Sequence, residues 1–201
     1  MQNKKVLFAT TNPAKVNKYI EELKKRNIEL LTINDINQKV DVNENGKNAI
    51  ENAYIKAKTY FDATGMITIG MDNNLFIEEL PEEKQPGTHV RRVNGKTLTD
   101  DEMIEYYTNL VKEYGGKLTA KWVYGMVIYN GKEAKKFTWS KDNFYFVDTP
   151  CEIRNQGYPL DSISIMPEYN KYFVELTKEE KNADKNKKSD DNVLNFIIDN
   201  I

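Results

Sequence analysis

The apolar residues of this chain recur with two periods, one typical of strands and one typical of helices. Residues 6–9 (VLFA) form a short apolar run, which predicts a buried strand. Over residues 12–26 the apolar side chains share one helical face, and residues 28–33 (IELLTI) predict a second strand. The chain therefore opens as strand, helix and strand.

Two further helices and a strand pair are predicted in the middle of the chain. A helix is expected from about 49 to 63, with a glycine as its C-terminal stop. The next segment, 66–80 (MITIGMDNNLFIEEL), predicts a strand, a polar break and a second strand. A third helix is predicted over 100–114, with Asp100 or Thr99 as its N-cap and a pair of glycines after it.

The second half of the chain is dominated by a long hairpin. Residues 119–147 alternate apolar and polar side chains around an Asn-Gly pair, which is typical of two antiparallel strands joined by a tight turn. This hairpin interrupts the strand–helix order, so we predict an α/β fold with a mixed β-sheet and flanking helices. The charge-dense segment 178–191 is expected to be solvated surface, followed by a last helix at 193–198.

Length, charge and cysteine content narrow the class of protein. At 201 residues the chain fits one domain, 1–201, made of two closely packed lobes, and roughly 70% of the surface of the unfolded chain can be buried at this size. With 29 basic and 31 acidic side chains the net charge is −2, so no overall basic field would draw the protein onto nucleic acid or an anionic membrane. A single cysteine, Cys151, excludes an intrachain disulfide. The sequence contains no run of about 18 apolar residues, so it predicts no membrane-spanning helix. We expect a cytoplasmic protein.

The turn between the first strand and the first helix is the first candidate for chemistry. Its sequence, ATTNPAK (9–15), leaves free backbone N–H groups at a helix N-terminus, where the helix dipole favours an anion. Thr10, Thr11 and Asn12 add side-chain donors, and Lys15 adds a point charge. The turn predicts a phosphate site, although a capped helix with a solvated lysine would give the same local sequence.

A second group of charged residues lies between 44 and 72. Glu44, Glu51, Lys56 and Asp72 fall in a predicted loop, helix and strand end. Carboxylates brought together can hold Mg²⁺, which binds one or two of them plus the phosphates of a substrate. The alternative is that Glu51 is a surface helix residue and Asp72 forms a turn.

Five segments together resemble one known family. They are ATTNPAK (9–15), GKNAIENAYIKAK (46–58), IGMDNNLFIEEL (69–80), PGTHVRRVNG (86–95) and GYPLDSISIMPEYNKYFVELTKEEKN (157–182). In order and spacing they resemble the inosine triphosphate pyrophosphatases, which remove nonstandard purine nucleotides. The resemblance implies an elongated two-lobed α/β fold with the nucleotide in the cleft, a homodimer, and Mg²⁺-dependent hydrolysis of a nucleoside triphosphate to the monophosphate and pyrophosphate.

The same resemblance implies roles for residues around the phosphates. It assigns triphosphate binding to the opening turn, with Thr10, Thr11, Asn12 and Lys15. It assigns the metal to Glu44 and Asp72, makes Asp72 the residue that activates the attacking water, and lets Lys56 contact a phosphate. Asn73 stands where the family has a Ser or Thr that touches substrate. Asp72 and Lys15 are the residues expected to act in catalysis.

The same resemblance implies that other residues contact the nucleotide. Tyr158 corresponds to the aromatic residue that stacks on the base, Asp161 to the aspartate of the same loop, and Lys181 to a lysine that contacts the nucleotide. Arg91 and its neighbour Arg92 are expected either to reach a phosphate or to be solvated loop charges.

The chain departs from the family pattern mainly in the half of the site that reads the base. The family follows its Lys-Asn pair with Ser-His-Arg, whereas Asn186 and Lys187 stand at the His and Arg positions here. Pro159 and Leu160 replace a glycine and an aromatic residue, and Met71 replaces the first acid of an acidic pair. The phosphate half is retained, and the preference for inosine or xanthosine nucleotides is left open.

Three functions are compatible with these residues. The first is a Mg²⁺-dependent nucleoside triphosphate pyrophosphohydrolase with an altered base pocket. The second has the same chemistry on a standard nucleotide, and the third is a nucleotide-binding regulator without turnover. The retention of Lys15, Glu44 and Asp72 argues against the third.

Overall fold

The computed structural model describes residues 4–36, 38–183 and 187–201. The chain divides into two compact units. Unit 1 comprises Met1–Asn73, Tyr124–Trp139 and Lys188–Ile201, and unit 2 comprises Asn74–Val123 and Ser140–Lys187.

A seven-stranded sheet, in the order β2-β1-β3-β6-β7-β8-β9, runs through both units. Its strands are β1 (Lys4–Ala9), β2 (Ile28–Thr32), β3 (Thr68–Ile77), β6 (Lys117–Tyr129), β7 (Ala134–Val147), β8 (Ser164–Met166) and β9 (Lys171–Tyr172). Strand β1 is parallel to β2 and β3, whereas β8 is antiparallel to β7 and β9. The predicted α/β fold with a mixed sheet is therefore confirmed.

Five α-helices and several shorter elements accompany this sheet in the described residues. The helices are α1 (Pro13–Lys24), α2 (Ala49–Thr64), α3 (Asp100–Glu113), α4 (Lys178–Ala183) and α5 (Lys187–Asn200). The short elements are the antiparallel pair β4 (Arg92–Val93) and β5 (Lys96–Thr97) and the 3₁₀ turns η1 (Ile33–Asp35), η2 (Glu82–Lys84), η3 (Pro159–Ser162) and η4 (Phe173–Glu175). Within the described residues, no helix is both long and apolar enough to cross a membrane.

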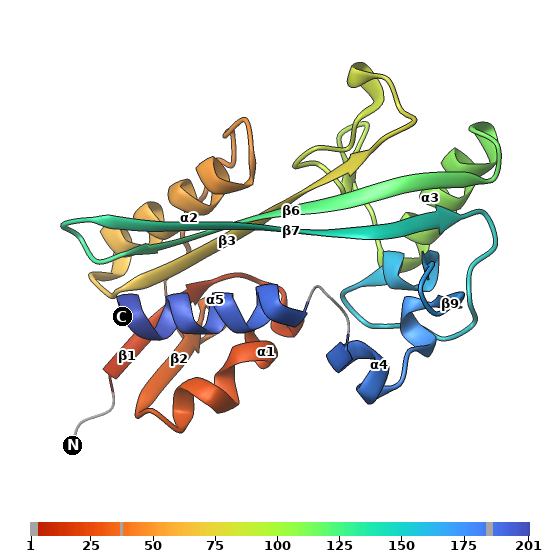
Figure 1. Cartoon of the computed structure of the whole chain (residues 1–201). Helices are drawn as coiled ribbons and strands as arrows, with labels where there is room; N and C mark the ends of the chain where they lie inside the picture. The colour runs from red at the N-terminus through yellow and green to blue at the C-terminus, as the bar shows by residue number, and fades with distance from the viewer. Residues whose placement is uncertain (1–3, 37, 184–186) are drawn as a thin grey trace. The chain divides into compact units, whose positions relative to one another are not determined.

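In unit 1 the helices cover both faces of the sheet, with α1 and α5 on one face and α2 on the other (Figure 1). Alternate residues of each strand supply the two faces, because successive side chains of a strand point in opposite directions. Phe8, Ile69 and Met71 pack in the same cluster as residues of α1 and α5. Tyr60 of α2 packs with Leu7 of β1 on the opposite face. Position 72 of β3 therefore faces α2, and position 73 faces α1.

Helix α2 lies unusually close to the sheet because two glycines face it. A Cβ atom at Gly70 of β3 would lie 2.0 Å from the Ala53 carbonyl oxygen, and one at Gly125 of β6 would lie 2.5 Å from the Ile50 backbone nitrogen. No rotamer change can relieve a contact with backbone atoms. The two glycines thus set how near the side chains of α2 come to β3.

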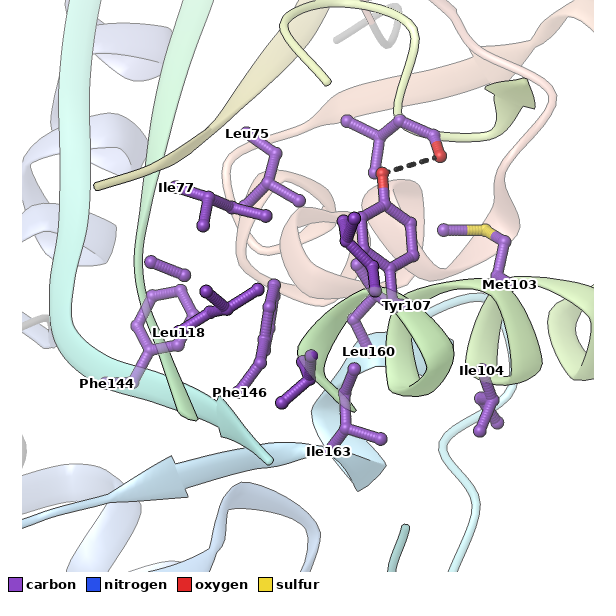
Figure 2. Packing of buried hydrophobic residues seen from close by; sticks show 14 of the residues in the cluster. Leu75, Ile77, Met103, Ile104, Tyr107, Leu118, Phe144, Phe146, Leu160 and Ile163 are labelled. Carbon is purple, nitrogen blue, oxygen red and sulfur yellow. Dashed lines mark hydrogen bonds between the residues drawn. The ribbon is translucent and has the colours of Figure 1, made fainter. Parts of the chain in front are cut away.

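The core of unit 2 forms where α3 packs on its parts of β3, β6 and β7 (Figure 2). Tyr107, Leu118 and Phe146 are each at most 1% exposed. The Tyr107 hydroxyl donates a hydrogen bond of 3.0 Å to the Val90 carbonyl, which leaves this buried polar group satisfied (Figure 2). Helix α3 is therefore fixed to the sheet by both apolar packing and one buried hydrogen bond.

Most predicted elements are present. Helix α2 ends at Thr64, and Gly65 follows it with φ of 68°, the left-handed conformation that glycine adopts easily. Thr99, rather than Asp100, caps α3, and its hydroxyl accepts a hydrogen bond from the Glu102 N–H. Strands β6 and β7 form the predicted hairpin strands on either side of Asn130.

Two predictions were wrong. Strand β3 continues from Thr68 to Ile77 without a polar break, because the polar side chains at its centre find lysine partners from the neighbouring helices. The last helix also starts earlier than expected, since α5 begins at Lys187 rather than at 193. The described part of the charge-dense segment is mostly solvated as predicted, since Lys178, Glu179 and Lys181 are exposed on α4. The start of α4 is stabilised by a reciprocal pair of hydrogen bonds between Thr177 and Glu180.

Candidate functional site

The turn after β1 forms the first part of the candidate site. The Thr10 hydroxyl accepts a hydrogen bond of 3.1 Å from the Asn12 N–H, which holds the turn at the start of α1. Helix α1 has no acidic residue in its first turn, so no side-chain carboxylate there neutralises the positive end of its dipole. Thr11 is exposed at the same turn. The turn thus offers an anion both hydrogen-bond donors and a favourable field.

Lys15 connects this turn to β3. Its ammonium donates a hydrogen bond of 3.1 Å to the Oδ1 atom of Asn73, 58 residues later in the chain. The pKa of Lys15 is lowered to about 8, first by burial and then by the positive charge of Lys56. The carboxylates of Asp72 and Glu44 act on this pKa in the opposite direction. A lysine held this way is not the solvated side chain that the local sequence also allowed.

The start of α2 is fixed by a network of local hydrogen bonds. The Asn48 side chain accepts from the Glu51 N–H at 3.0 Å, and the Glu51 carboxylate accepts from the Lys47 N–H at 2.8 Å. Asn52, only 1% exposed, accepts from the Gly46 N–H at 2.8 Å. Glu51 is therefore an exposed helix residue, as its alternative interpretation held, and its carboxylate also stabilises the helix N-terminus.

Lys56 of α2 bridges the two carboxylates that the sequence assigned to a metal. Its Nζ atom lies 2.8 Å from Oε2 of Glu44 and 3.2 Å from Oδ1 of Asp72. The side chains of Lys56 and Asp72 are only 14% and 11% exposed. Water screens the charges of this ion pair less than it would screen a pair on the open surface.

Asp72 has one oxygen that the protein leaves without a partner. Its Oδ2 atom is buried and has no hydrogen-bond partner among the described residues. A buried carboxylate oxygen without a donor is costly, and a bound cation or water would satisfy it. Glu44 adds a second carboxylate, but no group of three or more acidic, histidine or cysteine residues suited to a metal occurs in the part of the chain that the structure describes. The donor set fits a hard cation that takes its remaining ligands from water and substrate.

Met71 stands at the first position of the acidic pair that the resemblance implies. Its side chain is 6% exposed and lies in the apolar cluster with residues of α1 and α5. It therefore points to the face opposite Asp72 and contributes to the apolar core of unit 1.

A second set of predicted residues lies in unit 2. Tyr158 is half-buried and immediately precedes the turn η3, which carries Asp161. Burial raises the pKa of Asp161 to about 6, against the opposing effects of a hydrogen bond from Asn155 and the charges of Lys141 and Lys181. The Lys181 ammonium lies 5.4 Å from the centre of the Phe173 ring. Asp161 and Lys181 are thus brought within electrostatic reach of each other.

Arg91 has partners within the protein itself. Its guanidinium donates to the Asp100 carboxylate at 2.7 Å and to the Leu98 carbonyl at 3.0 Å. The other oxygen of Asp100 accepts a hydrogen bond of 3.0 Å from the Gly157 N–H, directly before Tyr158. Arg91 is therefore not a solvated loop charge, and through Asp100 it supports the loop that carries Tyr158.

Asp100 is the residue whose part in this arrangement the sequence did not reveal. It was considered only as a helix cap, and its separation of 57 positions from Gly157 leaves no local pattern that links the two. Of the predicted residues, Asn186 and the side chain of Lys187 lie outside the part of the chain that the structure describes.

Comparison with known proteins gives consistent matches along the chain. A model of the Ham1 family matches residues 6–189. The dITP/XTP pyrophosphatase of Clostridium perfringens is 30% identical over 190 residues, which cover 90% of each chain, and that of Bacillus subtilis is 28% identical over 180 residues, which cover 89% of each. The structure of the Staphylococcus aureus Ham1 protein aligns with a TM-score of 0.75 and 22% identity over 98% of both chains. At that identity the structural match shows the fold alone.

Proposed function

This chain belongs to the Ham1 family, and on that premise we propose that it hydrolyses purine nucleoside triphosphates to the monophosphate and pyrophosphate. Relatives at about 30% identity are dITP/XTP pyrophosphatases, which makes nonstandard purine nucleotides the first substrates to test. The observation that carries the proposal is the convergence of Lys15, Lys56, Glu44 and Asp72, whose charges act on one another beyond the end of β1.

Binding of the triphosphate is assigned to the turn after β1 and to the two lysines. Backbone N–H groups at the start of α1, with the side chains of Thr10, Thr11 and Asn12, would donate to phosphate oxygens. With a pKa of about 8, Lys15 is roughly nine-tenths protonated at pH 7, so it carries the charge that phosphate needs. Asn73, now bonded to Lys15, would orient that ammonium toward the substrate.

Catalysis is assigned to Asp72. Hydrolysis forms a bond from a water oxygen to the α-phosphorus and breaks the bond to the oxygen that leaves with pyrophosphate. The unpartnered Oδ2 atom of Asp72 is the atom we assign to this water, as the acceptor of its proton. Glu44 and Asp72 would hold Mg²⁺, which when bound supplies charge stabilisation for the phosphoryl oxygens.

Recognition of the base is assigned to unit 2, where Tyr158 would stack on the purine. Asp161 and Lys181 would contact the nucleotide, as would Asn186 and Lys187 at the positions of the missing His and Arg. A guanidinium only donates hydrogen bonds, so the family's Arg suits a 6-keto group and rejects a 6-amino group. Without that fixed donor, we propose that the enzyme discriminates less between 6-keto and 6-amino purine triphosphates as substrates. Hydrolysis of a standard nucleotide is therefore the second candidate function.

One assay separates these functions. Pyrophosphate release is measured with inosine, xanthosine, guanosine and adenosine triphosphates, in ribo and deoxy forms, for the wild type and for Asp72→Asn. We expect the wild type to hydrolyse purine nucleoside triphosphates. The rate should fall at least about a hundredfold in the folded Asp72→Asn variant, which is the scale for loss of a general base. Turnover unaffected by Asp72→Asn would overturn the assignment of catalysis to Asp72. If the wild type binds nucleotide without turnover, a nucleotide-binding regulator is the remaining function. A strong preference for inosine and xanthosine triphosphates over adenosine triphosphate would refute the altered base pocket.

We also infer a homodimer in the cytoplasm, on the strength of the family resemblance. Light scattering after gel filtration would give a mass close to twice the 23.4 kDa of one chain. A monomer at micromolar concentration would contradict this inference.

A further inference from the structure

The two carboxylates assigned to the metal are already held by a cation of the protein itself. The Lys56 ammonium lies 2.8 Å from Glu44 and 3.2 Å from Asp72. We propose that Lys56 is an internal counter-cation that keeps the nucleotide-free protein in a low-affinity state for divalent metal, and that it moves to the phosphates when nucleotide binds. Metal and nucleotide would then bind with positive coupling. The inference rests on the proposed function in assigning Glu44 and Asp72 to the metal.

The charges of the site support this competition. Lys56 contacts both carboxylates, Glu44 and Asp72, and Lys15 lies within electrostatic reach of all three groups. The two positive and two negative formal charges cancel. A divalent ion arriving alone finds no net negative charge and is repelled by both lysines. A triphosphate brings several negative charges, attracts both ammonium groups, and leaves the carboxylate oxygens to the metal.

Position 71, next to Asp72, holds a methionine and offers the metal no further carboxylate. Met71 is buried in the apolar cluster of unit 1, so Glu44 and Asp72 are the carboxylates in contact with Lys56. Among the described residues no larger group of metal ligands compensates for the ammonium that occupies them. A pair of carboxylates neutralised in this way binds a divalent ion weakly until other ligands arrive.

The fold allows Lys56 to move without moving its helix. The backbone of α2 is held against β3 and β6 at Gly70 and Gly125, where no room exists for even a methyl group. The lysine side chain, by contrast, ends in a compact charge on a flexible four-carbon stem. A change of side-chain torsions alone can therefore transfer the ammonium from carboxylate to phosphate.

Binding of Mn²⁺ to the full-length protein without nucleotide tests the first half of the proposal. Calorimetry or the electron paramagnetic resonance of free Mn²⁺ gives the affinity without any turnover. We expect Lys56→Gln to bind Mn²⁺ at least about tenfold more tightly than the wild type, within the usual range of coupling between sites. The matched control is Lys58→Gln, which removes the same charge from the exposed side of α2, where Lys58 pairs with Asp62. We expect its Mn²⁺ affinity to stay within about twofold of the wild type.

The second half is tested with inorganic triphosphate in the presence of a chelator. Here Lys56→Gln should bind at least about tenfold more weakly than the wild type, because a charged phosphate contact is lost. Lys56→Met keeps the apolar stem and repeats both measurements should Lys56→Gln fail to fold. Equal or weaker Mn²⁺ binding by these variants, or unchanged binding of triphosphate, would overturn the proposal. Absence of pyrophosphate release would count against the proposed function alone, since neither measurement depends on turnover.

Discussion

Substitution of Gly70 by alanine tests whether the close approach of α2 to β3 positions Lys56. A Cβ atom at this position would lie 2.0 Å from the Ala53 carbonyl oxygen and 2.8 Å from the Ala57 nitrogen. The shorter contact must open by about 1.4 Å to reach the 3.4 Å of an ordinary van der Waals contact. Both partners are backbone atoms, so α2 itself has to move away from the sheet.

The cost of that movement can be stated for stability and for activity. Overpacking a well-packed core costs about 1–3 kcal/mol, and we expect about 3 kcal/mol here because the backbone has to shift. For a chain of this size each kcal/mol lowers Tm by about 2–4 °C, so Gly70→Ala should melt about 6–12 °C below the wild type. Lys56 moves with α2, and a misplacement of about 1 Å in a catalytic site costs about a hundredfold in rate.

Thermal unfolding and pyrophosphate release are measured together on this variant. Gly65→Ala is the matched control, because its φ of 68° disfavours alanine while no atom lies within 4 Å of the added Cβ. It should lose about 1–2 kcal/mol of stability from the left-handed conformation and keep its activity. A Gly70→Ala variant as stable and as active as the wild type would refute the reasoning. So would a loss of activity in Gly65→Ala as large as that in Gly70→Ala.

Three further predictions concern single charged residues. Since the pKa of Lys15 is lowered to about 8, affinity for triphosphate should fall as pH rises through about 8. Lys15→Arg should remove this loss of affinity, because arginine stays charged over the same range. Identical pH profiles of KM in the two proteins would contradict the role of Lys15. Burial raises the pKa of Asp161 to about 6, so the folded state holds a proton that the unfolded chain releases near its ordinary pKa of 3.8. The stabilising contribution of Asp161 is therefore complete below pH 3.8 and lost as pH rises through about 6, and Asp161→Asn should flatten the decline of Tm over that range. Asp100→Asn loses the charged pair with Arg91 but keeps an acceptor for the Gly157 N–H. We expect KM to rise by up to about fivefold with kcat nearly unchanged. A fall in kcat alone would argue against a role of Asp100 in holding the Tyr158 loop.

Much of the fold follows from local pattern. The helix signals around α2 and α3, namely a polar cap, a repeating apolar face and a glycine at or just beyond the end, all lie within a few residues of one another. The hairpin of β6 and β7 is equally local, because alternation and the Asn-Gly pair are read directly from the chain. Local signals failed at β3, where Asp72, Asn73 and Asn74 look like a break but lie inside one continuous strand.

Part of the candidate site could likewise be predicted from local sequence, and part of it could not. The sequence by itself determined that a polar turn with Lys15 precedes a helix and that carboxylates flank α2, since residue identity and helix periodicity suffice for both. Only the tertiary structure decided that Lys15 bonds Asn73 from one face of β3 and that Lys56 reaches Asp72 from the other. These contacts join residues 58 and 16 positions apart, and their geometry depends on how closely each helix packs on the sheet. Such distances are set by packing between elements, which no window of the sequence contains.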